Sequence, residues 1–385
     1  MVGELRNLLT ERCLGFTLGD TNTPFYQGQY LVDTRDIVFV TMNYRVNIFG
    51  FSGAPGETQN VGLLDQRKAI EWVRDNIAGF GGDPSRISIM GQSAGGTAVD
   101  YYSYAYKHDP IVAGLISHSG TALSFKPNTA NFTQTNFLSA AALLGCKGSA
   151  VVACMREKPF AAVLNASAEI KPLPSLALPQ PVFHPTVDNI TVYADYTALA
   201  AAEAFAKIPY LAGNTDEESG YYRISAARQK ITLIDQQWRL FDLEGFTCAT
   251  GKETAARARA GVPVWRFRYF GDWPNLRLYP GSGSYHGSDL HMIFGGIEDI
   301  VGSGLPNNIY ENRTMEYMMR AWAVFVDDPK SGLSTRMHWP RYDPRRNTLA
   351  RLGYRMDPRA SFVAPAVYDG ACPKNNSVAE AQGAF

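Results

Sequence analysis

The sequence has no surplus of charge of either sign. Its 385 residues contain 36 Lys and Arg against 36 Asp and Glu. A balanced chain has no net field that would attract nucleic acid or an anionic membrane surface. We therefore expect no nucleic-acid partner and look for function in local sites.

Long apolar runs are also missing, although 45% of the residues are hydrophobic. No window approaches the roughly 18 to 20 unbroken apolar residues that a membrane-spanning helix requires. The first residues, Met1–Arg6, lack the apolar stretch of a signal peptide. The sequence thus predicts a soluble chain with no transmembrane anchor and no signal peptide of its own.

Cysteine is scarce, and its odd count of five leaves at least one residue without a partner. Cys146 and Cys154 enclose a short loop, and a disulfide there would stabilise the fold by roughly 2 to 3 kcal/mol. Two free thiols are the alternative. Asn-x-Ser/Thr sequons, which would accept glycans only in a secreted protein, occur at Asn131, Asn165, Asn189, Asn312 and Asn375.

Neither repeats nor low-complexity tracts divide the chain, and we predict one catalytic domain over residues 1–385. Residues 37–42 form a β-branched apolar run that is typical of a buried parallel strand. Apolar residues at helical spacing follow over 63–77. Strands alternating with helices indicate an α/β fold with a mostly parallel sheet. Further elements are expected as strands over 87–90, 112–116, 208–212 and 262–270 and a helix over 196–206.

The string Gly91-Gln92-Ser93-Ala94-Gly95 is the strongest chemical signal. Gly-x-Ser-x-Gly alone is a weak pattern, since an isolated match is more often an ordinary turn. Here an apolar strand precedes Ser93 and small residues follow it, as the sharp strand-to-helix elbow of a nucleophilic serine requires. At the start of that helix, the Ala94 N–H would be one donor to an oxyanion.

A serine hydroxyl needs a general base, and the sequence offers six histidines. In α/β-hydrolases the chain order is nucleophile, acid, histidine, which removes His108 and His118. His286 lies in a loop after the strand expected over 262–270 and is the best match. His291 is the alternative, although the apolar residues after it are typical of a helix.

The acid that orients the base should follow an intermediate strand. Asp216-Glu217-Glu218 comes directly after the strand expected over 208–212. The three carboxylates could equally form a solvated turn or the acidic first turn of a helix. Residue chemistry alone does not choose among them.

Several strings together resemble the type-B carboxylesterase family, which includes cholinesterases and fungal lipases, and the likeness is closest to fungal carboxylesterases. It covers about residues 15 to 370. The family implies an α/β-hydrolase fold, a mostly parallel central sheet flanked by helices, and a serine carboxylic-ester hydrolase that needs no metal or organic cofactor. Its substrates would be small-molecule or lipid esters. The strings are Asn43-Tyr44-Arg45-Val46, Asn60-Val61-Gly62-Leu63-Leu64-Asp65-Gln66-Arg67, Phe80-Gly81-Gly82-Asp83-Pro84 and Gly91-Gln92-Ser93-Ala94-Gly95-Gly96.

The resemblance also implies particular site residues. The family acid is a glutamate in an Asn-x-Asp-Glu string, which falls on Asn214-Thr215-Asp216-Glu217 and selects Glu217. The family histidine, followed by glycine, falls on His286. The pair Cys146 and Cys154 matches a family disulfide, which favours a secreted protein. The pairing of the other cysteines, Cys13, Cys248 and Cys372, stays open.

Two departures from the family pattern stand out. Cholinesterases have an acidic residue just before the serine, and here it is Gln92, which makes a choline ester a less favoured substrate. The family's Gly-Gly-Gly-Phe oxyanion loop falls on Cys13-Leu14-Gly15-Phe16, so Leu14 and Gly15 would supply the remaining donors.

Residues 1–14 are atypical of the family. We therefore expect an N-terminally truncated chain that lacks the N-terminal strands, a central one included. The alternatives to an active esterase are a truncated homologue with impaired or no catalysis and a non-catalytic cholinesterase-like binding protein.

Overall fold

A mostly parallel sheet forms the centre of the computed structural model, which describes residues 5–11, 15–21, 23, 26–172, 180–296 and 304–373. Cys13, Leu14 and Asn375 lie outside these residues. Within them, strands pair in the order β2-β1-β3-β4-β5-β6-β7-β8, with only the β7–β8 pair antiparallel. The strands are β1 (Leu5–Glu11), β2 (Ile37–Thr41), β3 (Gly82–Gln92), β4 (Gly114–His118), β5 (Tyr210–Thr215), β6 (Val264–Tyr269), β7 (Leu349–Leu352) and β8 (Ser361–Val363).

The middle of the sheet differs from the expectation that a central strand is lost. β1 pairs in parallel with β2 on one side and with β3 on the other. Its Leu8 is in register with Phe39 of β2 and with Ser88 of β3. Backbone pairing needs only an extended segment, so residues that are atypical of the family can fill this place and satisfy both neighbouring edges.

The two faces of the sheet are buried under separate layers of helices. Alternate residues of a strand point to opposite faces, so Ile89 belongs to one core cluster and Met90 to the other. The first cluster lies under α3 (Val61–Asn76), α4 (Ala94–Ala105), α8 (Tyr196–Ala201) and α11 (Ala249–Arg259). The second lies under α1 (Gln29–Thr34), α12 (Leu290–Phe294), α14 (Ile309–Asp327) and α15 (Gly332–Arg336).

The elements expected from the sequence agree with the structure in kind and differ in length. Each of the five expected strands falls on one of the strands from β2 to β6. The helix expected over 196–206 is shorter, since α8 ends at Ala201. Glu203 adopts a positive φ of 53°, which a continuing helix does not allow.

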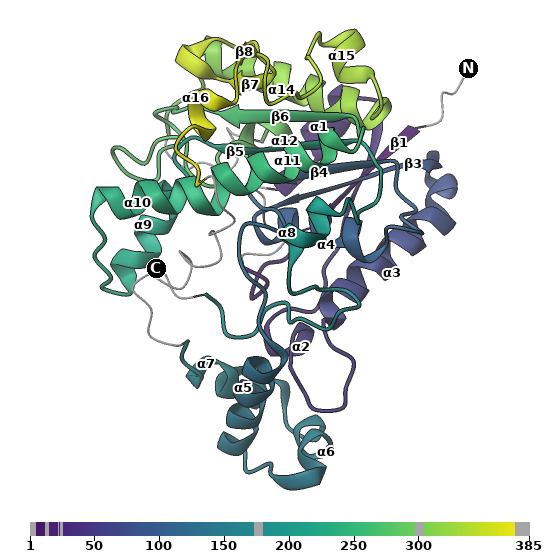
Figure 1. Ribbon diagram of the computed structural model, residues 1–385, viewed down its shortest axis with the longest axis vertical. Helices are drawn as coiled ribbons and strands as arrows, with labels where there is room; N and C mark the ends of the chain where they lie inside the picture. The colour runs from purple at the N-terminus through teal and green to yellow at the C-terminus, as the bar shows by residue number, and fades with distance from the viewer. Residues whose placement is uncertain are drawn as a thin grey trace.

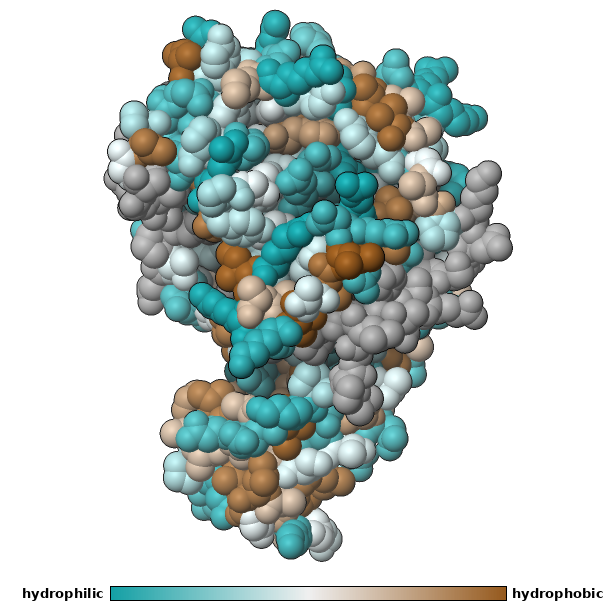
Figure 2. All heavy atoms as spheres, turned by 90° about the vertical axis from the view of Figure 1, so that its left-hand side faces the viewer, coloured by the Kyte–Doolittle hydropathy of each residue, from teal (hydrophilic) through white to brown (hydrophobic). Residues whose placement is uncertain are grey.

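A separate group of helices forms the lower end of the molecule (Figure 1). It contains α5 (Ala130–Leu143), α6 (Val151–Arg156) and α7 (Phe160–Glu169), which share a core cluster with Ile48 of α2 (Asn47–Gly50). A disulfide joins Cys146 to Cys154 within it. Figure 2 shows apolar side chains at the surface of this end.

Membrane-spanning helices were sought among the described residues. No single helix there is long and apolar enough to cross a bilayer. One bent pair, Ala130–Leu143 with Gly148–Arg156, passes the same test on length and composition, with an angle of 101° between its halves. Phe137 and Ala140 of this pair are buried in the protein's own core, as expected of a core helix.

Candidate active site

Three loops meet at one edge of the sheet, where parallel strands end. Ser93 follows β3, Glu218 follows β5, and His286 lies in the segment between β6 and α12. The carboxyl ends of parallel strands share one edge, so residues distant in sequence converge there. This edge brings together Ser93, His286 and a glutamate.

Ser93 occupies a strained turn between β3 and α4, with φ 59° and ψ −121°. A Cβ on Gly91 would lie 2.2 Å from the Gly95 carbonyl carbon, and one on Gly120 would lie 2.1 Å from the Ser93 carbonyl oxygen. Only glycine fits such close backbone approaches. The small residues around Ser93 are therefore the condition for the elbow, and the strain is typical of a functional site.

Of the three residues expected to bind an oxyanion, the structure describes two, Ala94 and Gly15. Ala94 is the first residue of α4, where backbone N–H groups and the helix dipole favour negative charge. Gly15 adopts a φ of 60°, and a Cβ there would lie 3.2 Å from Pro181 Cγ. A larger residue at 15 would be strained, but the direction of both amides toward an oxyanion stays a prediction.

The structure brings Glu218, and not Glu217, to His286. His286 Nδ1 is paired with Glu218 Oε2, and both side chains are buried. Glu217 is exposed and turns toward Gly283, where a Cβ would lie only 1.8 Å from its Oε2. Successive residues at the start of a helix point about 100° apart, so only one of two adjacent glutamates can face the base.

Glu218 is held by two further donors. Its Oε1 accepts hydrogen bonds from the Ser119 hydroxyl and from the Thr215 N–H, each at 2.7 Å. The side chain has 0% exposure, and a buried carboxylate needs such partners. Glu217 lacks these donors. Although the residue is exposed, partial desolvation of its carboxylate, and then repulsion from Asp216, raise its pKa.

The other imidazole nitrogen of His286 faces two groups that the sequence did not single out for this role. The Gln92 side-chain amide nitrogen lies 3.0 Å from His286 Nε2, and the Tyr222 hydroxyl lies 3.3 Å from it. Because Nδ1 faces a carboxylate, Nδ1 carries the proton and Nε2 is the acceptor. Tyr222 lies on α9 (Ser219–Arg228), four residues and about one helical turn after Glu218. This i, i+4 spacing could have pointed to Tyr222, because residues so spaced lie on the same face of a helix.

His291, the alternative base, is placed elsewhere. It lies on α12, is buried, and burial lowers its pKa to about 3. His286, by contrast, is the histidine whose ring joins Glu218 to the side chains around Ser93. The structure therefore favours His286 over His291.

Aromatic rings form one wall beside His286. The ring centroids of Tyr222 and Phe246 lie 5.0 and 5.2 Å from the His286 centroid. Phe241 packs on both rings, and Phe125 packs on Phe246. An apolar wall of this kind is typical of a pocket that binds an apolar group.

Phe246 belongs to a π-helix, Leu243–Cys248, between α10 (Asp235–Asp242) and α11. Such helices occur mostly as short segments at functional sites. A disulfide joins its last residue, Cys248, to Cys372. The sequence alone leaves this pairing open.

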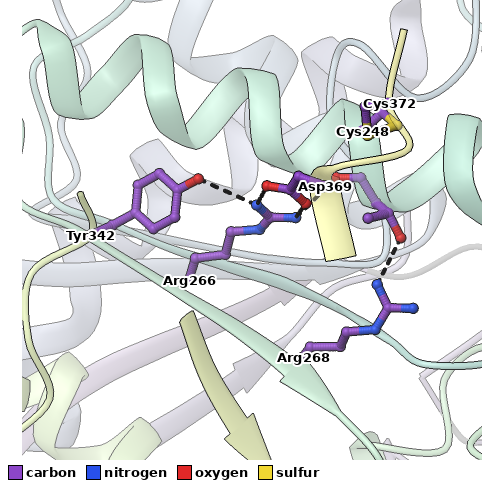
Figure 3. The surroundings of a disulfide bond; sticks show 7 residues. Cys248, Arg266, Arg268, Tyr342, Asp369 and Cys372 are labelled. Carbon is purple, nitrogen blue, oxygen red and sulfur yellow. Dashed lines mark hydrogen bonds and ion pairs between the residues drawn. A yellow bond between two sulfur atoms is a disulfide. The ribbon is translucent and has the colours of Figure 1, made fainter. Parts of the chain in front are cut away.

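Two arginines of β6 contact the π-helix from the side of the sheet. In Figure 3 the Arg266 guanidinium lies against Asp369, beside the disulfide, with oxygens at 2.5 and 2.8 Å. Arg266 also donates to the Thr247 carbonyl at 3.0 Å, and Arg268 donates to the Thr247 hydroxyl at 2.9 Å. Asp369 lies on α16 (Ala366–Asp369). The wall beside His286 is thus anchored to β6 and to the C-terminal segment.

The chain is similar in sequence to known proteins. The profile described as "Carboxylesterase family" matches residues 14–242. The chain is 35% identical over 384 residues to "Secreted lipase 5" of Gibberella zeae, covering 94% of this chain and 70% of that protein. It is 37% identical over 326 residues to "Chlorogenic acid esterase" of Aspergillus niger, covering 83% and 60%.

A more distant relative, "Cholinesterase 1" of Branchiostoma lanceolatum, is 30% identical over 219 residues and is matched over 54% of this chain and 61% of its own length. The chain thus spans between 60% and 70% of these three relatives. The relatives named as a lipase and as an esterase are hydrolases of ester bonds. The match to each of them covers most of this chain. From the family profile and these identities, this α/β-hydrolase chain belongs to the carboxylesterase family.

Proposed function

We propose that this chain is a serine carboxylic-ester hydrolase with Ser93 as nucleophile, His286 as general base and Glu218 as the orienting acid. Glu218 replaces Glu217, which the resemblance had favoured. The observation that carries the proposal is the pairing of His286 with buried Glu218 at the sheet edge where Ser93 sits in its strained elbow. This arrangement has the roles of a serine, histidine and acid triad.

The reaction follows from these roles. His286 Nε2 takes the proton of Ser93 as Oγ attacks the ester carbonyl carbon, and Glu218 stabilises the imidazolium that forms. The carbonyl oxygen becomes an oxyanion, for which the Ala94 and Gly15 amides are the proposed donors. The alcohol leaves with the proton from Nε2, and water then releases the acid from the acyl-enzyme by the reverse sequence.

The substrate proposal rests on the wall beside His286 and on the relatives. One relative is named a lipase and another a chlorogenic acid esterase. The aromatic wall favours esters with an apolar or aryl group, while neutral Gln92 gives no charge to attract a quaternary ammonium. We propose lipid or phenolic esters as substrates, and secretion as the setting, since two disulfides and the relatives named as secreted fit it.

Hydrolysis of p-nitrophenyl butyrate by the purified chain tests the proposal. Ser93→Ala should abolish activity, and a fluorophosphonate probe should label the wild-type chain at Ser93. Activity retained by Ser93→Ala would overturn the assignment. A folded chain that neither hydrolyses the ester nor reacts with the probe would support the inactive homologue or the binding protein. Comparing tributyrin, chlorogenic acid and butyrylcholine would then rank the substrate classes.

A further inference from the structure

The proton that leaves Ser93 must arrive at His286 Nε2, and that nitrogen is crowded. Two polar groups lie within hydrogen-bond distance of His286 Nε2: the Gln92 amide nitrogen at 3.0 Å and the Tyr222 hydroxyl at 3.3 Å. Nδ1 is occupied by Glu218. Any proton transfer in the proposed reaction therefore takes place beside these two side chains.

Tyr222 also lies near the other partner of that transfer, Ser93. The Ser93 side chain is among the groups that lower the pKa of the Tyr222 hydroxyl, against the larger rise caused by burial. The ring is fixed by Phe241, whose centroid lies 4.8 Å away, and by the His286 ring at 5.0 Å. One hydroxyl on a well-packed ring is thus within hydrogen-bond distance of the base and lies near the nucleophile.

Tyr222 and Gln92 differ in what they can do when the base becomes charged. An amide nitrogen only donates, so Gln92 in its present orientation suits a neutral Nε2 and opposes an imidazolium N–H. A phenol hydroxyl can donate or accept. Burial raises the pKa of Tyr222 well above its ordinary value, so the hydroxyl stays neutral. It can therefore accept a hydrogen bond from the imidazolium without carrying charge itself.

We propose that Tyr222 is a positioning residue for the proton transfer between Ser93 and His286, an inference that rests on the serine-hydrolase function proposed above. In the resting chain its hydroxyl lies 3.3 Å from His286 Nε2 and near the Ser93 side chain. As the Oγ–carbon bond forms and the proton moves to Nε2, the Tyr222 oxygen accepts a hydrogen bond from the new Nε2–H. The proton later passes from Nε2 to the leaving alcohol, and Tyr222 gains and loses no proton.

Tyr222→Phe removes the hydroxyl and keeps the ring. With p-nitrophenyl butyrate we expect kcat to fall by about tenfold, as the loss of one hydrogen bond allows, and KM to stay within about twofold. The acid limb of the kcat/KM profile should shift to lower pH, because the imidazolium loses an acceptor. Rates are normalised to the Ser93 titrated by the fluorophosphonate, so that misfolded chains do not count.

The matched control is Tyr221→Phe. The Tyr221 ring also lies beside His286, at 6.2 Å between centroids, but no hydrogen bond joins its hydroxyl to that ring in the described part of the chain. The Tyr221→Phe variant should keep the wild-type kcat and the wild-type pH profile of kcat/KM. Unfolding midpoints of both variants show whether the fold is retained.

The outcomes separate the two proposals. A folded wild-type chain that the probe does not label overturns the serine-hydrolase function itself. A labelled wild-type chain with a Tyr222→Phe variant of equal kcat and unshifted acid limb overturns only the role of Tyr222. A lower kcat without a shift of the acid limb would mean that the Tyr222 hydroxyl has only a structural role, and it would overturn the proposed role as well.

Discussion

His118 and Asp289 form a buried pair that ties the nucleophile to the loop of the candidate base. His118 Nδ1 lies 2.6 Å from Asp289 Oδ2, and neither side chain is exposed. The Trp322 indole donates to His118 Nε2 at 2.9 Å, so the proton on the imidazole is at Nδ1. The His118 carbonyl accepts the Ser93 N–H at 2.8 Å. Asp289 is three residues after His286. His118 therefore contacts both segments: its carbonyl binds the turn that carries Ser93, and its ring binds the loop that carries His286.

Asp289→Ala should therefore destabilise the fold and the site together. His118 would keep a buried Nδ1–H without an acceptor, and we expect the free energy of unfolding to fall by about 3 kcal/mol. Esterase activity per folded molecule should fall as the His286 loop loosens. Urea unfolding and p-nitrophenyl butyrate hydrolysis measure the two effects.

Asp272→Ala is the control for that variant. Asp272 also follows β6, but its ion pair with Arg277 is exposed, and such pairs contribute about 0 to 1 kcal/mol. Equal destabilisation by both variants would contradict the bridging role of the pair.

Replacing each of the two adjacent glutamates distinguishes the acid. Glu218→Gln should lower kcat by about 10³ to 10⁴, because the carboxylate no longer fixes the tautomer of His286 or stabilises the imidazolium. Glu217→Gln should stay within a few-fold of wild type. Ester hydrolysis under saturating substrate measures both. A larger loss at Glu217 would restore the assignment favoured by the family resemblance.

Glu253 should make stability depend on pH. This buried residue of α11 accepts hydrogen bonds from Arg257 Nε and the Tyr104 hydroxyl, both at 2.9 Å. Burial, and then Asp100, raise its pKa from 4.5 to about 7. Between these values the folded chain holds a proton that the unfolded chain has lost. The stabilisation is therefore complete below pH 4.5 and is lost as the pH rises to about 7.

Glu253→Gln should flatten this dependence, since the amide does not titrate. Thermal unfolding between pH 5 and 8 measures the slope, which for one group reaches about 1.4 kcal/mol per pH unit. Glu203→Gln, which changes an exposed ion pair with Lys207, should keep the wild-type slope. A Glu253→Gln variant with an unchanged slope would count against the role of this carboxyl.

The two disulfides should differ in their contribution to stability. Cys248 and Cys372 are 124 residues apart, and Cys146 and Cys154 are 8 apart. Loop-closure entropy gives about 5 kcal/mol for the long loop and about 2.5 kcal/mol for the short one. Replacing the long-range pair by alanine should lower the unfolding midpoint more, as calorimetry can measure. The reverse order would show that strain or residual structure outweighs chain entropy.

The strands and the elbow could be predicted because each has a local pattern, whereas chain order singled out His286 as the candidate base. Apolar runs mark β2 to β6, and the small residues around Ser93 mark the turn. The acid was harder. Two consecutive glutamates follow β5, and which one faces His286 depends on where α9 begins, a matter of one residue that periodicity does not resolve.

Contacts between residues far apart in the sequence could not be predicted either. The family pattern gave no candidate for the central strand, yet Leu5–Glu11 fills it through backbone pairing that imposes little on side-chain identity. The partner of Cys248 could not be read from spacing, because 124 residues separate it from Cys372. The Tyr222 hydroxyl was likewise missed, since its role depends on a ring packed by residues from three other segments.

The strand order also bears on synthesis. From β3 onward each new strand is added beside the one before it, while β1 lies between β2 and β3 and pairs with both. The four strands nearest the serine elbow, β1 to β4, all lie before residue 120 in the sequence. The remaining strands extend the sheet in chain order away from β3, so synthesis supplies Ser93 first, then Glu218, the proposed acid, and then His286, the proposed base.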